Sequence, residues 1–306
     1  RLFPNTSGAE VAAGLNVVPT ATGFDLYNNN DSHNRSGDTY IYIAIRRPMK
    51  TPESGTEVFS PVARTGTGTT AAVTGVGFSP DLFIGNIRDT AGYWNGVVDR
   101  LRGISNRLVS SQDGAENTQT VITSFDMDGL SLTSDGNGFA NENGKTYIQW
   151  LFKRATGFMD EVVATPSGYA WSNVPHNLGV TPELLIYKPR ASGAWYVMSS
   201  ALASSNYYML LNDTAAATLS GASQYSATAT TVSFPSMPSN ASTVAYLFAT
   251  LAGVSKVGSY TGTGSNVDVD CGFSAGARFI LIKRTDSTGD WYVWDSARGI
   301  VAGNDP

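Results

Sequence analysis

Apolar positions recur along this chain in short runs that fit strands. In TYIYIAI (39–45), tyrosine and isoleucine alternate, so the two kinds of side chain point to opposite faces of an extended segment. Apolar runs such as LFIGNIR (82–88) have strand length, and turn-forming clusters such as SDGNGFANENGK (134–145) separate them. No segment keeps a 3.6-residue apolar period over three turns. The pattern predicts an all-β protein built from short antiparallel strands.

The strand patterns return in the same order, which indicates an internal repeat. The opening RLFPNTSGAE (1–10) returns as RLVSSQDGAE (107–116), and Gly23 and Leu26 stand 106 positions before Gly129 and Leu132. A predicted strand with aromatic residues forms the last part of a unit at 39–47, 146–154 and 243–251. A turn followed by an apolar strand and then a Trp begins at 77, 178 and 271. Self-similarity at a fixed period is the signature of repeated modules.

The repeat predicts tandem antiparallel β-sandwiches, jelly-roll-like, with units of about 100 residues. Residues 1–58 hold the second half of one unit, and residues 59–155 form a complete unit. Residues 156–251 form a complete but divergent unit, and residues 252–306 hold the first half of another. A sequence that starts and stops within a unit is expected to be a segment of a longer polypeptide.

Composition excludes several classes of protein. The net charge of −5 argues against a nucleic-acid-binding face, which needs clustered basic residues. No apolar run approaches the roughly 18–20 residues of a membrane-spanning helix, so no membrane insertion is expected. Cys271 is the only cysteine, which rules out a disulfide within one chain. We expect Cys271 to be a small buried apolar residue.

The ordered motifs resemble a known viral module. The residues that carry the resemblance are LGVTPELLIYKPRASGAWYV (178–197), WYVWDSARG (291–299), SFDMDGLSL (124–132) and KTYIQWLFKR (145–154). They resemble a module found in tandem in tailed-bacteriophage proteins, many of them tail-fibre or appendage proteins, often from marine phages. The resemblance implies a β-rich structural or host-contacting component of the virion without established enzymatic activity. It also implies other virion proteins as partners and a homo-oligomer, with a trimer as one arrangement.

The sequence offers few candidates for catalysis. GFSAG (272–276) matches the G-x-S-x-G nucleophile elbow, but a strand-like ARFILIKR follows it where the elbow needs a helix, so we expect Ser274 to lie in a turn. His33 and His176 are the only histidines, which nearly excludes a histidine general base or a multi-histidine metal site. We expect both histidines to be exposed loop residues.

Asp126 and Asp128 form an i, i+2 carboxylate pair in SFDMDG, as do Asp268 and Asp270 in NVDVD. On a strand such a pair faces one side, where it could bind Ca²⁺ or act as glycosidase acids. FDMDG lacks the further ligands of a full calcium loop, and Asp-Gly is an ordinary hairpin turn. We therefore expect a turn and no cofactor, with Asp126 and Asp128 as weak Ca²⁺ candidates.

Two further motifs recur with the units. Asp99 with Arg102, and Asp295 with Arg298, share an i, i+3 spacing that suits an ion pair within a turn. A tryptophan recurs at the same place in the motif, after the apolar strand, in three of the units, and we expect all three to be equivalent, buried core anchors: Trp94, Trp195 and Trp291. Stacking on a sugar is the alternative use of these rings.

Surface contact is expected at positions that differ between the units. The candidates are Tyr207 and Tyr208, which occur in one unit, and His33 and Asn29 in the Asn-rich loop 27–38. The leading interpretation is a non-enzymatic virion structural protein, a tail fibre or appendage in the extracellular particle that contributes to host attachment. A lectin-like module that binds host glycan and a capsid decoration protein are the alternatives. A polysaccharide depolymerase is disfavoured.

Overall fold

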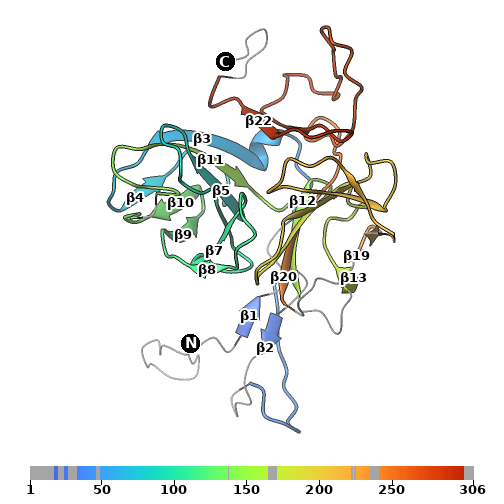
Figure 1. Ribbon diagram of the computed structural model, residues 1–306. Coiled ribbons are helices and arrows are strands. Elements are labelled where there is room, and N and C mark those ends of the chain that lie inside the picture. Colours follow the sequence, from blue (N-terminus) through green and yellow to red (C-terminus); the bar gives the residue numbers. More distant parts are fainter. Residues whose placement is uncertain are drawn as a thin grey trace. The chain divides into compact units, whose positions relative to one another are not determined.

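The computed structural model describes residues 17–19, 24–26, 33–45, 49–136, 138–164, 171–221, 223, 225–234 and 241–299. The chain separates into two compact units, Arg1–Pro48 and Met49–Pro306. Almost all regular structure is antiparallel β-strand, with one 3₁₀ turn at Gly55–Glu57 (Figure 1), so the predicted all-β class is confirmed. Within the part of the chain that is described, no helix is long and apolar enough to span a membrane.

The larger unit begins with a module of two antiparallel sheets. Its large sheet has the order β3 (Phe59–Thr65), β11 (Thr146–Phe152), β5 (Leu82–Ile87), β6 (Gly96–Asp99), β7 (Asn106–Val109), β8 (Asn117–Thr118). Its small sheet has the order β4 (Ala71–Val73), β10 (Gly129–Leu132), β9 (Ile122–Asp126). Apolar side chains from both sheets form one core between them, including Phe83, Val98, Phe125, Leu130 and Leu151. The first module is therefore a β-sandwich.

A second module follows with the same strand order. Its large sheet runs β12 (Met159–Ala164), β20 (Thr243–Phe248), β14 (Leu184–Pro189), β15 (Tyr196–Ser199), β16 (Tyr207–Leu210), β17 (Thr218–Leu219). Its small sheet runs β13 (Trp171–Pro175), β19 (Thr231–Phe234), β18 (Ser226–Ala227). The ring of Phe234 lies 5.4 Å from that of Trp171 and 5.1 Å from that of Tyr187. The shared order is what a repeat predicts, while close superposition of the two modules stays a prediction.

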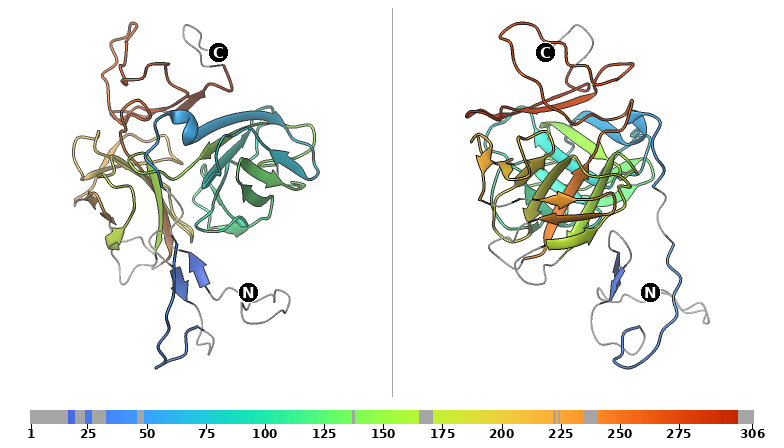
Figure 2. Two further views of the ribbon diagram at one scale, coloured as in Figure 1. Left: turned by 180° about the vertical axis from the view of Figure 1, so that it is seen from behind. Right: turned by 90° about the vertical axis from the view of Figure 1, so that its right-hand side faces the viewer.

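A hairpin near the end of the chain (red in Figure 2) corresponds to part of a module. It consists of β21 (Phe279–Lys283) and β22 (Trp291–Asp295). Phe279 pairs with Asp295, as Leu82 pairs with Asp99 in β5 and β6. Residues 256–278, which precede the hairpin, are described without strands. The smaller unit contains a second hairpin, β1 (Val17–Pro19) and β2 (Phe24–Leu26).

The central strands β11 and β6 in the large sheet of the first module are buried on both faces. Along β11, Leu151 faces the sandwich core, whereas Ile148, Trp150 and Phe152 face a second core. This alternation follows from the period of two along a strand. The second core also includes Trp195 and Tyr246 of the second module, with Phe279 of the hairpin against it. The two modules and the hairpin therefore share one apolar core.

Buried aspartates join the modules at the edge of this shared core. Asp99 and Arg102 form an ion pair without solvent exposure, and the Tyr246 hydroxyl of the second module donates to Asp99 over 2.7 Å. In the hairpin, Asp295 and Arg298 form an ion pair, and Trp150 Nε1 donates to Asp295 over 3.0 Å. Both ion pairs that the spacing predicted are thus present.

The two donors occupy the same strand position. Trp150 lies two residues before Phe152, which pairs with Leu82, the first residue of β5. Tyr246 lies two residues before Phe248, which pairs with Leu184, the first residue of β14. An aromatic donor from one module thus meets the aspartate of another module at two places in the fold. We call each such contact an aspartate latch.

Two tryptophans make a second repeated contact. Trp195 Nε1 donates to the carbonyl of Val109 over 2.7 Å, and Trp291 Nε1 donates to the carbonyl of Leu210 over 2.9 Å. Val109 pairs with Gly96 and Leu210 with Tyr196, so the two carbonyls occupy equivalent positions.

The prediction that Trp94 is an equivalent buried anchor is wrong, because its side chain is 50% exposed. Trp291 lies four residues before Asp295, whereas Trp94 lies five before Asp99, so Asn95 takes the anchor position. Trp195 is buried, and Trp291 is partly buried. The one-residue offset places Trp94 on the surface.

We expect replacement of a buried tryptophan to lower the stability of the fold much more than replacement of an exposed tryptophan. Trp195→Ala removes a buried ring from the contact between modules and should lower the free energy of unfolding by about 3–5 kcal/mol. Trp94→Ala should change it by less than about 0.5 kcal/mol, as for most surface positions. Urea titrations of both variants test this, and equal losses would contradict the assignment of Trp195 to the shared core.

Glu161 is a further buried acidic residue, and it lies near the Asp99–Tyr246 latch. It has no solvent exposure, it pairs with Tyr246 across β12 and β20, and neither carboxyl oxygen has a hydrogen-bond partner among the described residues. Burial raises the pKa of Glu161 well above 4.5, and the nearby carboxylates of Asp99 and Asp81 raise the pKa further. Arg154 opposes this rise in the pKa.

The raised pKa makes stability depend on pH. The folded protein holds the Glu161 proton more tightly than the unfolded chain, so ionisation costs stability as the pH rises from about 4.5 through the folded pKa. Glu161→Gln cannot ionise and should gain stability relative to the wild type across that range. Denaturant titrations at a series of pH values measure the difference, and a difference that does not change with pH would contradict the buried position of Glu161.

Candidate functional site

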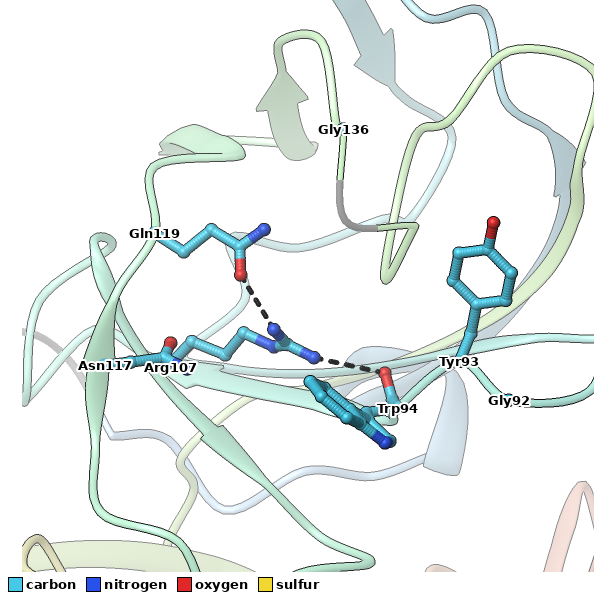
Figure 3. Close-up of a pocket in the computed structure, with 7 residues that line it drawn as sticks. All are labelled: Gly92, Tyr93, Trp94, Arg107, Asn117, Gln119 and Gly136. Carbon is cyan, nitrogen blue, oxygen red and sulfur yellow. Dashed lines mark hydrogen bonds between the residues drawn. The ribbon is translucent and has the colours of Figure 1, made fainter.

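The first module carries a surface pocket of about 330 Å³ beside β7 and β8. Trp94 and Tyr93 come from the loop before β6, Arg107 from β7, and Asn117 from β8. Gln119 and the loop residues Gly92 and Gly136 complete the lining (Figure 3). The half-exposed indole of Trp94 and the exposed amide of Asn117 are open to solvent, whereas Arg107 is buried. The pocket thus combines an accessible aromatic ring with side-chain amides.

Arg107 organises the floor of the pocket. Its guanidinium donates to Gln119 Oε1 over 2.7 Å and to the carbonyl of Trp94 over 3.4 Å (Figure 3). The guanidinium carbon lies 4.7 Å from the centre of the Phe139 ring, a cation–π distance. Burial lowers the pKa of Arg107, and the negative charge of Asp135 partly offsets this effect. Arg107 therefore connects Gln119 and the backbone of Trp94, which both line the pocket.

A glycine makes room for the ring beneath Arg107. A Cβ added to Gly96 would lie 2.2 Å from an atom of the Phe139 ring, so a larger residue cannot occupy the start of β6 while Phe139 keeps this place. Tyr196 holds the equivalent position in the second module, because it pairs with Leu210 as Gly96 pairs with Val109. The glycine at the start of β6 therefore belongs to the packing around Phe139 in the first module, and the second module has a tyrosine in its place.

The side chains of the pocket occur in one module only. Strand pairing places Ala194 where the first module has Trp94, and Tyr208 where it has Arg107. Ser220 corresponds in the same way to Gln119. Positions that vary between otherwise similar modules are where a binding function is expected. Sequence comparison missed the site because it aligned Trp94 with Trp195, although the longer spacing to Asp99 was visible.

The structure separates the two carboxylates proposed for Ca²⁺. Asp126 ends β9 and accepts hydrogen bonds from the hydroxyls of Ser124 and Ser131, at 2.6 and 2.7 Å. Asp128 lies in the turn before β10 and accepts from the backbone of Gly77 and Gly75, at 2.6 and 2.9 Å. These backbone hydrogen bonds lower the pKa of Asp128. The two side chains therefore brace a hairpin and the loop beside it.

No metal cluster is found among the described residues, since no three His, Cys, Asp or Glu side chains converge there. Asp268 and Asp270 lie in an exposed irregular segment, where Asp270 accepts from the backbone of Gly272 over 2.7 Å. A Ca²⁺ site at either carboxylate pair stays a weak candidate from the sequence alone.

The predicted surface residues do not form one site. The expectation that His176 is exposed is wrong, because it is buried, accepts from the backbone of Leu178 over 3.2 Å, and has a pKa that burial lowers. His33 lies in a turn and is partly buried, while Asn29 lies outside the described residues. Tyr207 and Tyr208 lie in β16 and are partly buried, so they are strand residues and not a loop tip.

The remaining reactive candidates lie apart from the pocket. Ser274 is exposed in a bend, and the strand β21 follows it, as expected for a turn. Cys271 is partly exposed in an irregular segment, which corrects the expectation of a buried apolar residue. Neither residue is among those that line the pocket.

The fold defines an all-β protein of antiparallel sandwich modules with a surface pocket on the first module. Residues 54–304 match a family described as a domain of unknown function (DUF7483), and the chain belongs to this family. The match spans both modules and the hairpin β21–β22 as one stretch. No curated protein and no solved structure matches the chain significantly.

Proposed function

We propose that this protein is a non-enzymatic structural and attachment component that binds carbohydrate in the Trp94 pocket. The single observation that carries the proposal is the half-exposed indole of Trp94 beside side-chain amides in one module only. Sugars present apolar C–H faces that stack on aromatic rings and hydroxyl groups that exchange hydrogen bonds with amides. Asn117 and Gln119 supply such amides next to the ring.

The chemistry of the lining supports binding over catalysis. Cleavage of a glycosidic bond ordinarily uses two carboxyl groups across the scissile bond. Among the described residues, those that line the pocket include no carboxylate, histidine or thiol. The carboxylates of Asp126 and Asp128 are engaged by hydroxyls and backbone amides of their own hairpin and the adjacent loop. A binding module therefore fits these side chains better than a depolymerase.

The virion setting of the proposal rests on the resemblance of the repeated motifs to phage tail-fibre and appendage modules. Stacked rigid sandwiches can act as spacers, and variable loops on them can contact a host surface. A weak site becomes effective when an oligomer presents several copies of it. We therefore expect a host surface glycan as the ligand and other virion proteins as partners.

Binding to an array of bacterial surface polysaccharides tests the proposed function. The wild type should bind a subset of glycans, and Trp94→Ala should reduce the signal at least about tenfold, since stacking contacts of this kind contribute about 1–3 kcal/mol. The variant carries the residue that the second module has at the equivalent position, Ala194, so its folding should be unaffected. Isothermal titration with a retained glycan gives the affinity.

Tyr292→Ala is the matched control, because Tyr292 is an aromatic residue with 51% exposure outside the pocket. It should bind glycans like the wild type. Equal binding by the wild type and Trp94→Ala, or release of reducing sugar from a bound polysaccharide, would contradict the proposal.

A further inference from the structure

The floor of the Trp94 pocket contains a buried positive charge without a carboxylate partner. Arg102 and Arg107 are both almost fully buried, with 5% and 2% exposure. Arg102 forms ion pairs with Asp99 and Glu116. Among the described residues, the guanidinium of Arg107 forms no ion pair, and its Nε has no hydrogen-bond partner. Buried charges in proteins are ordinarily paired, so the counter-charge of Arg107 is missing from its own surroundings.

Two carboxylates lie near the pocket, but neither is among the described residues that line it. Asp135 accepts hydrogen bonds from backbone amides of its own loop, at 3.0, 2.7 and 3.2 Å. Burial lowers the pKa of Arg107, and the negative charge of Asp135 opposes this effect without forming a direct contact. Glu142 contacts the hydroxyl of Tyr93 over 3.5 Å. A ligand in the pocket therefore meets a positive floor and no negative wall.

Arg107 also determines which end of the Gln119 amide a ligand meets. A guanidinium has donors only, so the Gln119 atom that lies 2.7 Å from Arg107 Nη1 is the amide oxygen. The amide nitrogen consequently points away from Arg107, as Figure 3 shows. Its N–H groups are left as donors for a ligand in the pocket.

These donors lie beside the ring on which a sugar would stack. Trp94 is half-exposed, and its backbone carbonyl accepts from the same guanidinium that orients Gln119. A sugar on the indole would therefore place one of its substituents near the Gln119 amide. An acidic substituent suits donors that are backed by a positive charge, because charge-assisted hydrogen bonds are roughly twice as strong as neutral ones.

The second module lacks both parts of this arrangement. Strand pairing places Tyr208 at the position of Arg107 and Ser220 at that of Gln119. Neither replacement carries a positive charge or an amide. The guanidinium and the amide that it orients thus occur in the same module as the exposed indole of Trp94.

We propose that the Trp94 pocket binds an acidic sugar, whose negatively charged group accepts hydrogen bonds from the Gln119 amide and is attracted by the charge of Arg107. This inference rests on the proposed function and names the class of glycan. The carboxylate of a uronic acid and a sulfate ester share the required chemistry. Either group supplies the counter-charge that Arg107 lacks within the chain.

Matched acidic and neutral glycans test the requirement for charge. One pair consists of an oligosaccharide that contains glucuronic acid and its carboxyl-reduced form, in which glucose replaces the acid. The other pair consists of a sulfated oligosaccharide and its desulfated form. In isothermal titration, the wild type should bind the acidic member of at least one pair with a dissociation constant about tenfold lower or better, and that pair identifies the group. Equal dissociation constants within both pairs, or no binding to any of the four, would overturn the proposal.

Trp94→Ala separates this inference from the proposed function. Binding that depends on Trp94 but is equal for acidic and neutral forms would leave carbohydrate binding in place and remove the acidic class. Binding by Trp94→Ala that equals that of the wild type would remove both.

Gln119→Glu gives Arg107 a carboxylate within the chain and keeps the size of the side chain. The introduced carboxylate lies where the amide oxygen accepts from Arg107, so it replaces the charge of the ligand and removes the amide donors. The dissociation constant for the acidic form should rise at least about tenfold, while that for the neutral form should change less than about threefold.

Gln112→Glu is the matched control, because it makes the same change of charge at a residue that does not line the pocket. It should keep the preference of the wild type for the acidic form. An equal preference in Gln119→Glu and Gln112→Glu would contradict the role of Arg107 and Gln119.

The stability of Gln119→Glu measures the missing counter-charge without a ligand. At pH 7 the buried guanidinium gains an ion pair, so the urea concentration at the midpoint of unfolding should exceed that of the wild type. The ion pair lowers the pKa of the introduced carboxyl in the folded state, so the gain should be complete above about pH 4.3 and disappear as the pH falls through the folded pKa. A midpoint at pH 7 at or below that of the wild type would show that Arg107 already has its counter-charge, and would overturn the proposal.

Discussion

The structure depends on a carboxylate that has no contact with water. Asp99 accepts hydrogen bonds from the backbone and guanidinium of Arg102 and from the hydroxyl of Tyr246 in the next module. Burial lowers the pKa of Arg102, but the charges of Asp99 and Glu116 outweigh this effect and raise the pKa above its usual value. A buried ion pair is tolerated only when its partners are complete, so loss of one partner leaves an uncompensated charge. The modules are therefore held in one relative register.

The strands that carry the aspartate latches also contribute to the shared core. The latch positions lie on the strands whose outward side chains build the shared core, as Trp150 and Tyr246 show. Because the central strands β11 and β6 are buried on both faces, a binding site has to lie on loops or towards the edge of the sheet. The pocket around Trp94 occupies such a place, and its side chains are those that the second module replaces. The sandwich scaffold and the Trp94 pocket thus have separate sequence requirements.

Strand-length apolar runs such as 82–88, separated by turn-forming clusters, were sufficient to predict the all-β class, because this pattern is a local property. The Asp-Arg spacing likewise predicted two ion pairs, since both partners lie within one turn. The position of Trp94 was predicted wrongly, because one inserted residue changes the face that a side chain occupies. The role of Tyr246 could not be predicted, since its partner Asp99 is 147 residues away in the sequence. His176 is buried for the same reason, through Thr228 in a distant loop.

A double-mutant cycle between Asp99 and Tyr246 measures most directly whether the modules depend on this latch. The cycle compares the free energies of unfolding of Asp99→Asn, Tyr246→Phe, the double variant and the wild type. Contact across the module boundary predicts a coupling energy of about 1–3 kcal/mol, as found for residues in one hydrogen-bond network. Additive effects, with a coupling energy below about 0.3–0.5 kcal/mol, would show that the two side chains act independently and would contradict the account.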